Sequence, residues 1–321
     1  MTRSATRVIH VAVGVVWRDG QILIARRPDS AHQGGLLEFP GGKVEPGETV
    51  QQALVRELRE ETGVSVQPQS LQPLIGIRHD YGDKQVFLDV WETRSSSGTP
   101  QGLEGQPVFW RSPGSLRAED FPAANRPIIN AVRLPRMLAI TGNTESPQVA
   151  ADHCLHGVQA SGVPMMVLRL PSLTPAHYSD AVRLCVEGMP RTDVLIHDHP
   201  EVLAEVPAAG VHLSWRRASV LSTRPFPEGR WFGVSCHNGE ELAHAAAIGA
   251  DYATLGPVLP TPSHPGHTGM GWEWFSGLVK DALIPVYALG GVGPQDLDQA
   301  LKHGGQGVAG ISWWWPPSSQ L

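Results

Sequence analysis

Apolar positions follow two different rhythms in the two halves of the chain. In the first half, β-branched runs at 8–17 and 22–25 are separated by an Asp-Gly pair, which is a hairpin signal. Three further runs are interpreted as strands: 73–78, 85–92 and 107–110. A polar stretch over 94–106 predicts a long exposed loop, and a helical pattern over 126–134 closes the unit. The pattern predicts an α/β/α sandwich, a mixed sheet with helices on its faces.

After residue 134, short apolar runs alternate with helical stretches, which is the rhythm of a parallel sheet. Eight such runs occur, at 137–141, 165–170, 193–198, 210–215, 231–237, 252–258, 285–291 and 307–313. Eight strands with intervening helices predict a (β/α)8 TIM barrel, in about 185 residues rather than the usual length of about 250. Two domains are therefore expected, over residues 1–134 and 137–321.

The segment 41–64 carries the densest chemical signals of the first half. Thr49 and Gln52 have the spacing of a capping box, and Gly63 stands where a helix would end. These signals predict a helix over about 50–62.

Three carboxylates of this helix, Glu57, Glu60 and Glu61, stand at i, i+3 and i+4, which places them on one face within about 100°. Like charges at this spacing repel one another, so the cluster favours a divalent cation over a plain solvated face. Mg²⁺ suits such a helix, because it binds a few carboxylates together with substrate phosphates and keeps several waters. Mn²⁺ also suits oxygen ligands.

Charge and cysteine usage narrow the class of protein. A net charge of −6 and a pI near 6.1 argue against direct nucleic-acid binding, because neutralising phosphates needs a basic face. The three cysteines are far apart and lack metal-ligand spacing, which indicates reduced core thiols. The apolar run at 8–17 is too short to span a membrane and has no cleavage site, so a cytoplasmic protein without a membrane partner is expected.

The order of Gly42, Glu48 and RELREETGV at 56–64 resembles the complete Nudix box, the signature of hydrolases acting on nucleoside diphosphates linked to another group. Outside the box, three stretches resemble the MutT branch, the 8-oxo-dGTP diphosphatases: ARRPDSAHQGGLLEFPGGK (25–43), EGQPVFW (104–110) and DFPAANRPII (120–129). The resemblance covers roughly residues 7–134. It implies metal-dependent hydrolysis of 8-oxo-dGTP to 8-oxo-dGMP and pyrophosphate, which cleans the nucleotide pool before DNA replication.

The same resemblance implies a nucleotide pocket formed by Arg27, His32, Glu38, Phe39, Pro40, Gly41 and Asn125. Asn125 would read the purine edge, because an amide donates and accepts simultaneously, and Phe39 would form the apolar wall. Taken singly, Asn125 is also compatible with a helix N-cap, and Phe39 with a core position.

For the chemistry, the resemblance implies these metal ligands: Glu57, Glu60 and Glu61, with a backbone carbonyl of Gly41 or Gly42. Water would attack the β-phosphorus, with Glu57 or Glu104 as the general base. Arg56 is expected to hold the loop against the helix through Glu48, because its planar fork suits a bidentate carboxylate contact.

Active residues of a barrel lie at the carboxyl ends of its strands, so the candidates in the second half follow the eight runs. They are Arg169, Asp198, His212, His237, Thr261, Ser263, Gly290, Gly291 and Ser312. The last two glycine-containing turns are where barrels often bind phosphate through backbone N–H groups.

This half resembles the thiamine phosphate synthase and thiazole tautomerase superfamily over about residues 137–313, most clearly at GVHL (210–213), 232–263 and 288–312. The resemblance implies a phosphorylated thiazole or pyrimidine ligand. The synthase pattern is incomplete, because only Arg169 remains of a Gln-x-Arg-x-Lys strand end, and Arg217 replaces a metal aspartate. Synthase activity is therefore not expected, whereas His237 resembles the acid/base histidine of the tautomerases.

Two alternatives remain for the function of the fusion. In one, the Nudix half hydrolyses a thiamine-related diphosphate made or bound by the barrel. In the other, the barrel is a non-catalytic module that senses a phosphorylated ligand and modulates the hydrolase.

Overall fold

The computed structural model describes residues 8–30, 33–80, 82, 85–261, 266 and 268–315. The chain divides into two compact units, Met1–Leu134 and Pro135–Leu321. Each unit contains its own hydrophobic core. No helix within the described ranges is long and apolar enough to cross a membrane.

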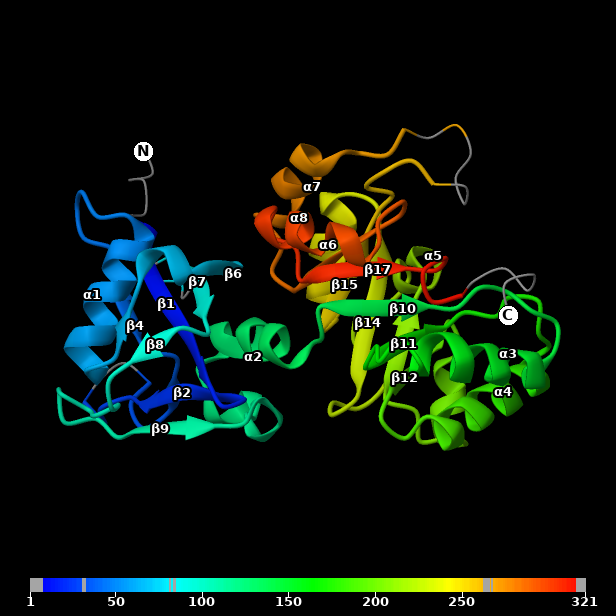
Figure 1. Cartoon of the computed structure of the whole chain (residues 1–321), viewed down its shortest axis with the longest axis horizontal. Helices are drawn as coiled ribbons and strands as arrows, with labels where there is room; N and C mark the ends of the chain where they lie inside the picture. The colour runs from blue at the N-terminus through cyan, green and yellow to red at the C-terminus, as the bar shows by residue number, and fades with distance from the viewer. Residues whose placement is uncertain are drawn as a thin grey trace. The chain divides into compact units, whose positions relative to one another are not determined.

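The first unit is built on a mixed sheet whose described part has seven strands (Figure 1). They are β1 Val8–Arg18, β2 Gln21–Arg26, β3 Leu37–Glu38, β4 Gly41–Lys43, β6 Gln72–Asp80, β7 Gln85–Thr93 and β9 Val108–Arg111. The order is β3-β2-β1-β7-β6, with β4 also paired to β1 and β9 to β2. Strand β1 runs parallel to β7 and the other pairs are antiparallel, which confirms the predicted mixed sheet.

Both faces of this sheet are covered, because successive residues of a strand point to opposite sides. Val15 of β1 belongs to a cluster that includes residues of α2 (Arg126–Arg133). Its neighbour Val16 belongs to a second cluster with residues of α1 (Val50–Thr62). The predicted sandwich is therefore confirmed.

Helix α1 begins and ends where the sequence predicts. Thr49 Oγ1 accepts a hydrogen bond from the Gln52 backbone N–H at 3.2 Å, and Gln52 Oε1 accepts one from the Thr49 N–H at 2.8 Å. The helix ends at Gly63, whose φ of 67° is left-handed, and the Gly63 N–H donates to Arg59 O at 3.1 Å. The acidic residues between these caps therefore lie on a rigid element.

The predicted loop over 94–106 contains one element that the sequence does not reveal. Strand β8 (Ser96–Ser97) pairs antiparallel with β5 (Ser65–Val66), which follows α1. Two serines give no apolar alternation, so the pairing depends on the loop folding back on the helix end. The start of the loop is thereby held beside the carboxyl end of α1.

The second unit is a closed barrel whose described strands are all parallel, as predicted. The eight are β10 Met137–Ile140, β11 Met165–Leu168, β12 Asp193–His197, β13 Gly210–Leu213, β14 Trp231–Cys236, β15 Tyr252–Leu255, β16 Val286–Leu289 and β17 Gly307–Gly310. Every predicted run contains one strand. The run at 210–215 ends early because Ser214 begins the next helix.

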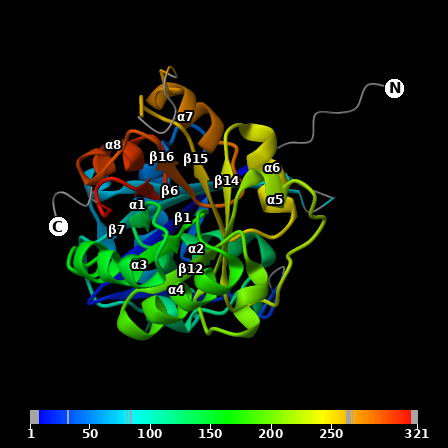
Figure 2. The same ribbon diagram turned by 90° about the vertical axis from the view of Figure 1, so that its right-hand side faces the viewer.

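Short connections explain how a barrel fits into this length. The longer helices of this unit lie around the strands (Figure 2): α3 Pro147–His153, α4 Pro175–Gly188, α6 Gly239–Ala247, α7 Trp272–Val279 and α8 Leu297–Lys302. After β12 the connection contains only a 3₁₀ helix, Pro200–Ala204, and after β13 only the single turn α5, Trp215–Ala218. The three cysteines are buried free thiols of this unit, as the sequence predicts.

The substitution Gly63→Ala tests the end of α1. We expect it to destabilise the last turn by about 1 kcal/mol, because alanine is strained at a positive φ. The nearest atom to an added Cβ is Leu103 Cδ1 at 3.7 Å, so the cost is conformational rather than steric. Amide hydrogen exchange of α1 peptides in the full chain should accelerate about fivefold.

The matched control for this variant is Gly114→Ala. Gly114 lies outside the left-handed region, and an added Cβ would meet nothing within 4 Å. Exchange in α1 should not change in the control. An equally unchanged rate in Gly63→Ala would show that the cap conformation does not hold the helix end.

Candidate functional site

The three carboxylates of helix α1 do not share one orientation. An added Cβ on Gly42 would lie 2.2 Å from Glu57 Cδ, so the Glu57 carboxyl group packs directly on strand β4. The Gly41 N–H donates to Glu61 Oε2 at 3.2 Å. The side chain of Glu60 is 58% exposed, against 16% for that of Glu57. The structure therefore brings Glu57 and Glu61 together at β4 and leaves Glu60 at the rim.

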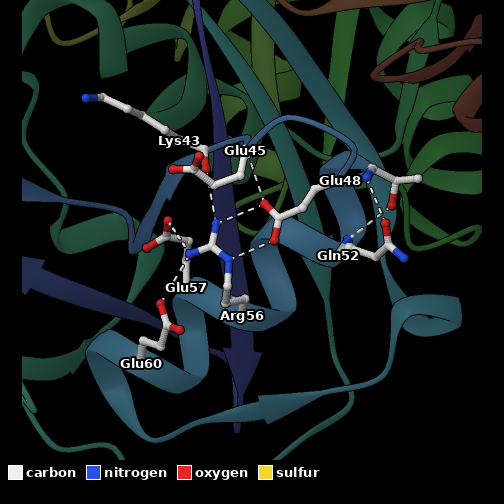
Figure 3. A network of polar contacts seen from close by, with 8 residues as sticks. Lys43, Glu45, Glu48, Gln52, Arg56, Glu57 and Glu60 are labelled. Atoms are coloured by element: carbon white, nitrogen blue, oxygen red, sulfur yellow. Dashed lines mark hydrogen bonds and ion pairs between the residues drawn. The ribbon is translucent and has the colours of Figure 1, made fainter.

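Arg56 organises the outer side of this site (Figure 3). Its Nε and Nη2 donate to the two carboxylate oxygens of Glu48 at 2.8 and 3.0 Å, which is the expected bidentate pair. Its Nη1 donates to Glu57 Oε1 at 2.8 Å and to Glu60 Oε2 at 3.2 Å. Hydrogen bonds from Arg56 and from the Glu45 N–H lower the pKa of Glu48 to about 2. Arg56 therefore fastens the loop before the helix to the helix itself.

On the side of the site that faces β3 and β4, the carboxylates outnumber the positively charged groups that act on them. Burial is the main cause that raises the pKa of Glu61 to about 7; the charges of Glu38, Glu57 and Glu104 also act to raise it, and the hydrogen bond from Gly41 opposes them. Burial also raises the pKa of Glu38, although its ion pair with Arg27 opposes that effect. Four carboxylates from three separate segments thus influence one another, which is the electrostatic signature of a functional site.

The chemistry of this site fits a hard divalent cation. Its donors are carboxylate and backbone oxygens, and it has a surplus of negative charge beside a glycine. Among the described residues, no three His, Cys, Asp or Glu side chains lie close enough to hold a metal ion. Glu57 and Glu60 are held by Arg56, and Glu61 is held by the Gly41 N–H. Ligation by all three would require Glu60 to leave Arg56.

The predicted nucleotide pocket lies partly on strand β3. Glu38 pairs with Arg27 at this strand. Phe39 is only 4% exposed, and its ring stacks on that of Phe121 at a centroid distance of 5.4 Å. Both rings belong to the core, so Phe39 supports the pocket from behind more than it lines an open surface. Pro40 is buried beside it.

Asn125 follows the segment that packs on Phe39. By backbone position it is the N-cap of α2, but its side chain makes no capping hydrogen bond. The side chain is half-buried and has no hydrogen-bond partner among the described residues. Asn125 therefore occupies the N-cap position without using its side chain as a cap, and its amide is free to meet a ligand. His32 lies outside the described residues.

Glu104 lies in the turn that follows β8, and its side chain is exposed. The residue that holds this turn, Gln106, was not predicted from the sequence. It is only 8% exposed and is hydrogen-bonded to the backbone of Glu61 and Glu104. A lone glutamine between Gly105 and Pro107 carries no spacing signal of its own. The role of Gln106 in holding the turn is apparent only from its burial and its hydrogen bonds in the folded chain.

In the barrel, Asp198 follows β12 and is committed to the protein itself. Its Oδ1 accepts from the Ser214 N–H at 2.7 Å and its Oδ2 accepts from Ser214 Oγ at 2.8 Å. Burial acts to raise the pKa of Asp198, but His197, the two hydrogen bonds from Ser214 and the charge of Arg217 together lower it. Because Ser214 already engages both oxygens of Asp198 and the charge of Arg217 acts on it, Asp198 is a poor ligand for a magnesium ion.

Two histidines, His197 and His212, lie at or near the carboxyl ends of the neighbouring strands β12 and β13. Burial lowers the pKa of His197 to about 4 and that of His212 to about 3, so both are neutral near pH 7. His212 is 1% exposed, and its ring nitrogens lie 3.0 Å from the Tyr252 hydroxyl and 2.8 Å from Ser235 Oγ. The expectation that His212 is a strand-end active residue is corrected, because its side chain fills the barrel interior.

His237 follows β14 and has a partner of its own. Its Nδ1 lies 2.9 Å from Glu241 Oε2, and the side chain is 53% exposed. A carboxylate can only accept, so Glu241 fixes the proton on Nδ1 and leaves Nε2 as the nitrogen that could exchange a proton with a ligand. This arrangement is compatible with the predicted acid/base role.

The glycine turn after β16 has the predicted left-handed backbone, with φ of 89° at Gly290 and 72° at Gly291. An added Cβ at Gly291 would lie 2.5 Å from Pro260 O, so the turn packs closely on the segment after β15. Of the other candidates, Arg169 and Ser312 are exposed and Thr261 is half-buried. Ser263 lies outside the described residues.

Known families match the two compact units separately. The NUDIX domain model matches residues 12–131, and the thiamine monophosphate synthase model matches residues 137–313. The chain therefore belongs to the Nudix family through its first unit and to the thiamine monophosphate synthase family through its second. The predicted fusion of the two is confirmed.

Particular relatives are found for each unit. The chain is 43% identical over 122 residues to the 8-oxo-dGTP diphosphatase of Escherichia coli, which covers 38% of this chain and 93% of the relative. It is 37% identical over 125 residues to the CTP pyrophosphohydrolase of Escherichia coli, covering 39% and 91%. It is 36% identical over 163 residues to a putative thiamine-phosphate synthase of Geobacter sulfurreducens, covering 49% and 76%.

The raised pKa of Glu61 generates a prediction for stability in metal-free solution. The unfolded chain ionises Glu61 near pH 4.5, whereas the folded protein does so near pH 7, so folding loses stability as the pH rises between these values. Glu61→Gln removes this loss. In EDTA, the variant should unfold at a higher temperature than the wild type at pH 8 and at the same temperature at pH 4.5.

Thermal unfolding scans at both pH values check this prediction, and the pH 4.5 pair is its internal control. Added Mg²⁺ at pH 8 should reverse the order, because only the wild type retains the Glu61 carboxylate. A variant that is equally or less stable than the wild type in EDTA at pH 8 would contradict the electrostatic account of the site.

Proposed function

We propose that the first unit hydrolyses nucleoside triphosphates to the monophosphate and pyrophosphate, with 8-oxo-dGTP as the preferred substrate. The observation that carries the proposal is the cluster of Glu57, Glu61, Glu38 and Glu104 around strand β4, in a chain 43% identical to an 8-oxo-dGTP diphosphatase over 93% of that relative. The surplus of negative charge suits a cation together with a triphosphate. In the cell, the reaction would remove a mutagenic nucleotide before a polymerase uses it.

The ligands of the cation would be Glu57 and Glu61, joined by Glu60 once it leaves Arg56 and by a carbonyl of Gly41 or Gly42. Mg²⁺ is the proposed ion, with Mn²⁺ as a substitute, and when bound it would neutralise charge on the phosphate oxygens. Gly42 has its own part, because any side chain there would displace the Glu57 carboxylate.

Of the two candidates for the general base, the contacts favour Glu104. Glu57 packs on Gly42 and accepts a hydrogen bond from Arg56 Nη1 at 2.8 Å. The side chain of Glu104 is exposed and has no hydrogen-bond partner among the described residues, so its oxygens are available to a water molecule. A base must be within hydrogen-bond reach of the proton that it accepts, and Glu104 is free to meet that condition.

Nucleotide selection is assigned to Asn125, with Arg27 and Glu38 at the edge of the pocket. The unengaged amide of Asn125 can donate to and accept from one base edge, which suits the altered hydrogen-bond pattern of an oxidised guanine. The Phe39–Phe121 stack places this segment beside the strand that carries Glu38.

A second candidate function is hydrolysis of CTP. The observation that favours it is the 37% identity to a CTP pyrophosphohydrolase over 91% of that relative. Both candidates use the same carboxylates and differ only in the base that the pocket accepts. The 8-oxo-dGTP diphosphatase is the more similar of the two relatives.

For the barrel, we propose a module that binds a phosphorylated thiazole or pyrimidine without magnesium-dependent synthase chemistry. Asp198 at the end of β12 is engaged by Ser214 through both carboxylate oxygens, so it is not free to hold a magnesium ion. Arg169 stands at the end of β11, where its charge reaches His197, and it has no ion pair among the described residues. Arg169 and the N–H groups of the Gly290 turn are the proposed phosphate contacts.

Pyrophosphate release by the purified full-length protein with Mg²⁺ tests the first proposal. The value of kcat/KM for 8-oxo-dGTP should exceed that for dGTP by roughly 10³-fold or more, because a pocket built for one hydrogen-bond pattern rejects another. Asn125→Ala should reduce this preference by about 10- to 100-fold and leave the dGTP rate little changed. Glu61→Gln should release no pyrophosphate.

Two further substrates in the same assay separate the alternatives. A preference for CTP would replace the first candidate by the second. A preference for thiamine diphosphate would overturn both and join the two units in one thiamine-related reaction sequence.

Calorimetric titration of the full-length protein with thiazole phosphate tests the barrel proposal. Binding should be equally tight in EDTA and in Mg²⁺, and Arg169→Ala should weaken it at least about tenfold. The control is Arg191→Ala. Arg191 is exposed and precedes β12, so it lies at the amino ends of the parallel strands, whereas Arg169 lies at their carboxyl ends. Binding that requires Mg²⁺ would contradict the proposal, and hydrolase rates with and without the ligand report whether the barrel acts as a sensor.

A further inference from the structure

The end of helix α1 is closed by the 98–106 loop. The Leu103 N–H donates to Glu61 O at 2.9 Å, and the Gln101 N–H donates to Thr62 O at 2.9 Å. The last carbonyls of an α-helix have no partner inside the helix, so they need donors from elsewhere. The loop that carries Glu104 is thus fastened to the helix that carries Glu61.

The side chain of Gln106 adds a second fastening beneath the loop. It is buried, its Nε2 donates to Glu61 O at 3.1 Å, and its Oε1 accepts from the Glu104 N–H at 3.0 Å. A single amide therefore joins the backbone of Glu61 to the backbone of Glu104. Because both the Oε1 and the Nε2 of Gln106 are hydrogen-bonded, the link fixes the distance between these two backbone segments.

The turn around Glu104 has little freedom to move independently of Gln106. The Gly105 N–H donates to Gly102 O at 3.1 Å and closes the turn. An added Cβ on Gly102 would lie 1.5 Å from Gln106 O, so the turn packs directly on the Gln106 backbone. A shift of Gln106 therefore displaces Glu104.

The charge of the Glu104 carboxylate acts on the site although no described residue forms a hydrogen bond with its side chain. Its charge acts on both Glu61 and Glu38. The side chain is exposed and has no hydrogen-bond partner in the described part of the chain. Its position relative to the helix carboxylates is therefore set by its backbone, which Gln106 and the turn hold.

We propose that Gln106 is a positioning residue for hydrolysis, whose amide holds Glu104 at a fixed place beside Glu61 and Glu38. This inference rests on the proposed function of the first unit. In the reaction, the oxygen of water forms a bond to the β-phosphorus, and Glu104 takes the proton. The bond from the β-phosphorus to the bridging oxygen breaks, so that the nucleoside monophosphate leaves with that oxygen and pyrophosphate is released.

Gln106→Met is the variant that tests the link, because methionine has a similar length and shape but cannot make either hydrogen bond. The kcat for the best nucleotide should fall about 10- to 100-fold with KM nearly unchanged, since a small displacement of a reacting group costs this much. Amide hydrogen exchange in residues 101–106 should accelerate. Gln101→Met makes the same change in the same loop at an exposed side chain and should alter neither quantity.

A double variant separates positioning from general stability. Glu104→Gln alone should lower kcat, and addition of Gln106→Met should then lower it by no more than about twofold, because the group that Gln106 positions is already absent. Losses that multiply fully in the double variant would show that Gln106 acts independently of Glu104, and they would overturn the proposal.

A second substitution keeps the test usable if Gln106→Met does not fold. Gln106→Glu can still accept from the Glu104 N–H but cannot donate to Glu61 O, and it should also lose kcat and gain loop exchange. A wild-type protein that releases no pyrophosphate from any nucleoside triphosphate would defeat the proposed function, and the positioning role with it. Active wild type with equally active Gln106 variants would defeat the positioning role alone.

Discussion

Repulsion among carboxylates is the constraint on which the first unit depends. Glu57 and Glu61 lie one helical turn apart, and the charges of Glu38 and Glu104 add to theirs from other segments. The fold meets this repulsion with local contacts: Arg56 donates to Glu57 on the outer side, and the Gly41 N–H donates to Glu61 on the inner side. These contacts do not neutralise the cluster, because the pKa of Glu61 remains near 7. The remaining imbalance is what a cation and a triphosphate would use.

The barrel handles charge in the opposite way. At the end of β12 the charges of Arg169 and Arg217 act on His197 and Asp198, and the Asp198 carboxylate is held by Ser214. Burial keeps His197 neutral, and the charges of Asp198 and Arg169 act on it in opposite directions. The family fold is therefore retained while the charge pattern at the strand ends differs from one that recruits a metal, which illustrates that function depends on the site rather than on the fold.

Much of the architecture was predictable because its signals are local in the sequence. The Thr49–Gln52 capping box and the left-handed Gly63 act within a few residues, and they fix both ends of α1. The eight barrel strands are buried on both sides, so they appear as continuous apolar runs. Features that join distant segments were not predictable. The β5–β8 pair and the Gln106 bridge depend on the loop returning to the helix end, and no spacing in the sequence records that return.

The residues that could bind a cation are already identified by the sequence, because helix geometry alone places Glu57, Glu60 and Glu61 on one face. How each carboxylate is used depends on the folded chain: β4 receives Glu57 and Glu61, and Arg56 holds Glu60 at the exposed rim. It also decided that Phe39 belongs to the core and that His212 fills the barrel interior. Residue type and spacing define which contacts are chemically possible, but burial and long-range neighbours determine which contacts form and what charge each group carries.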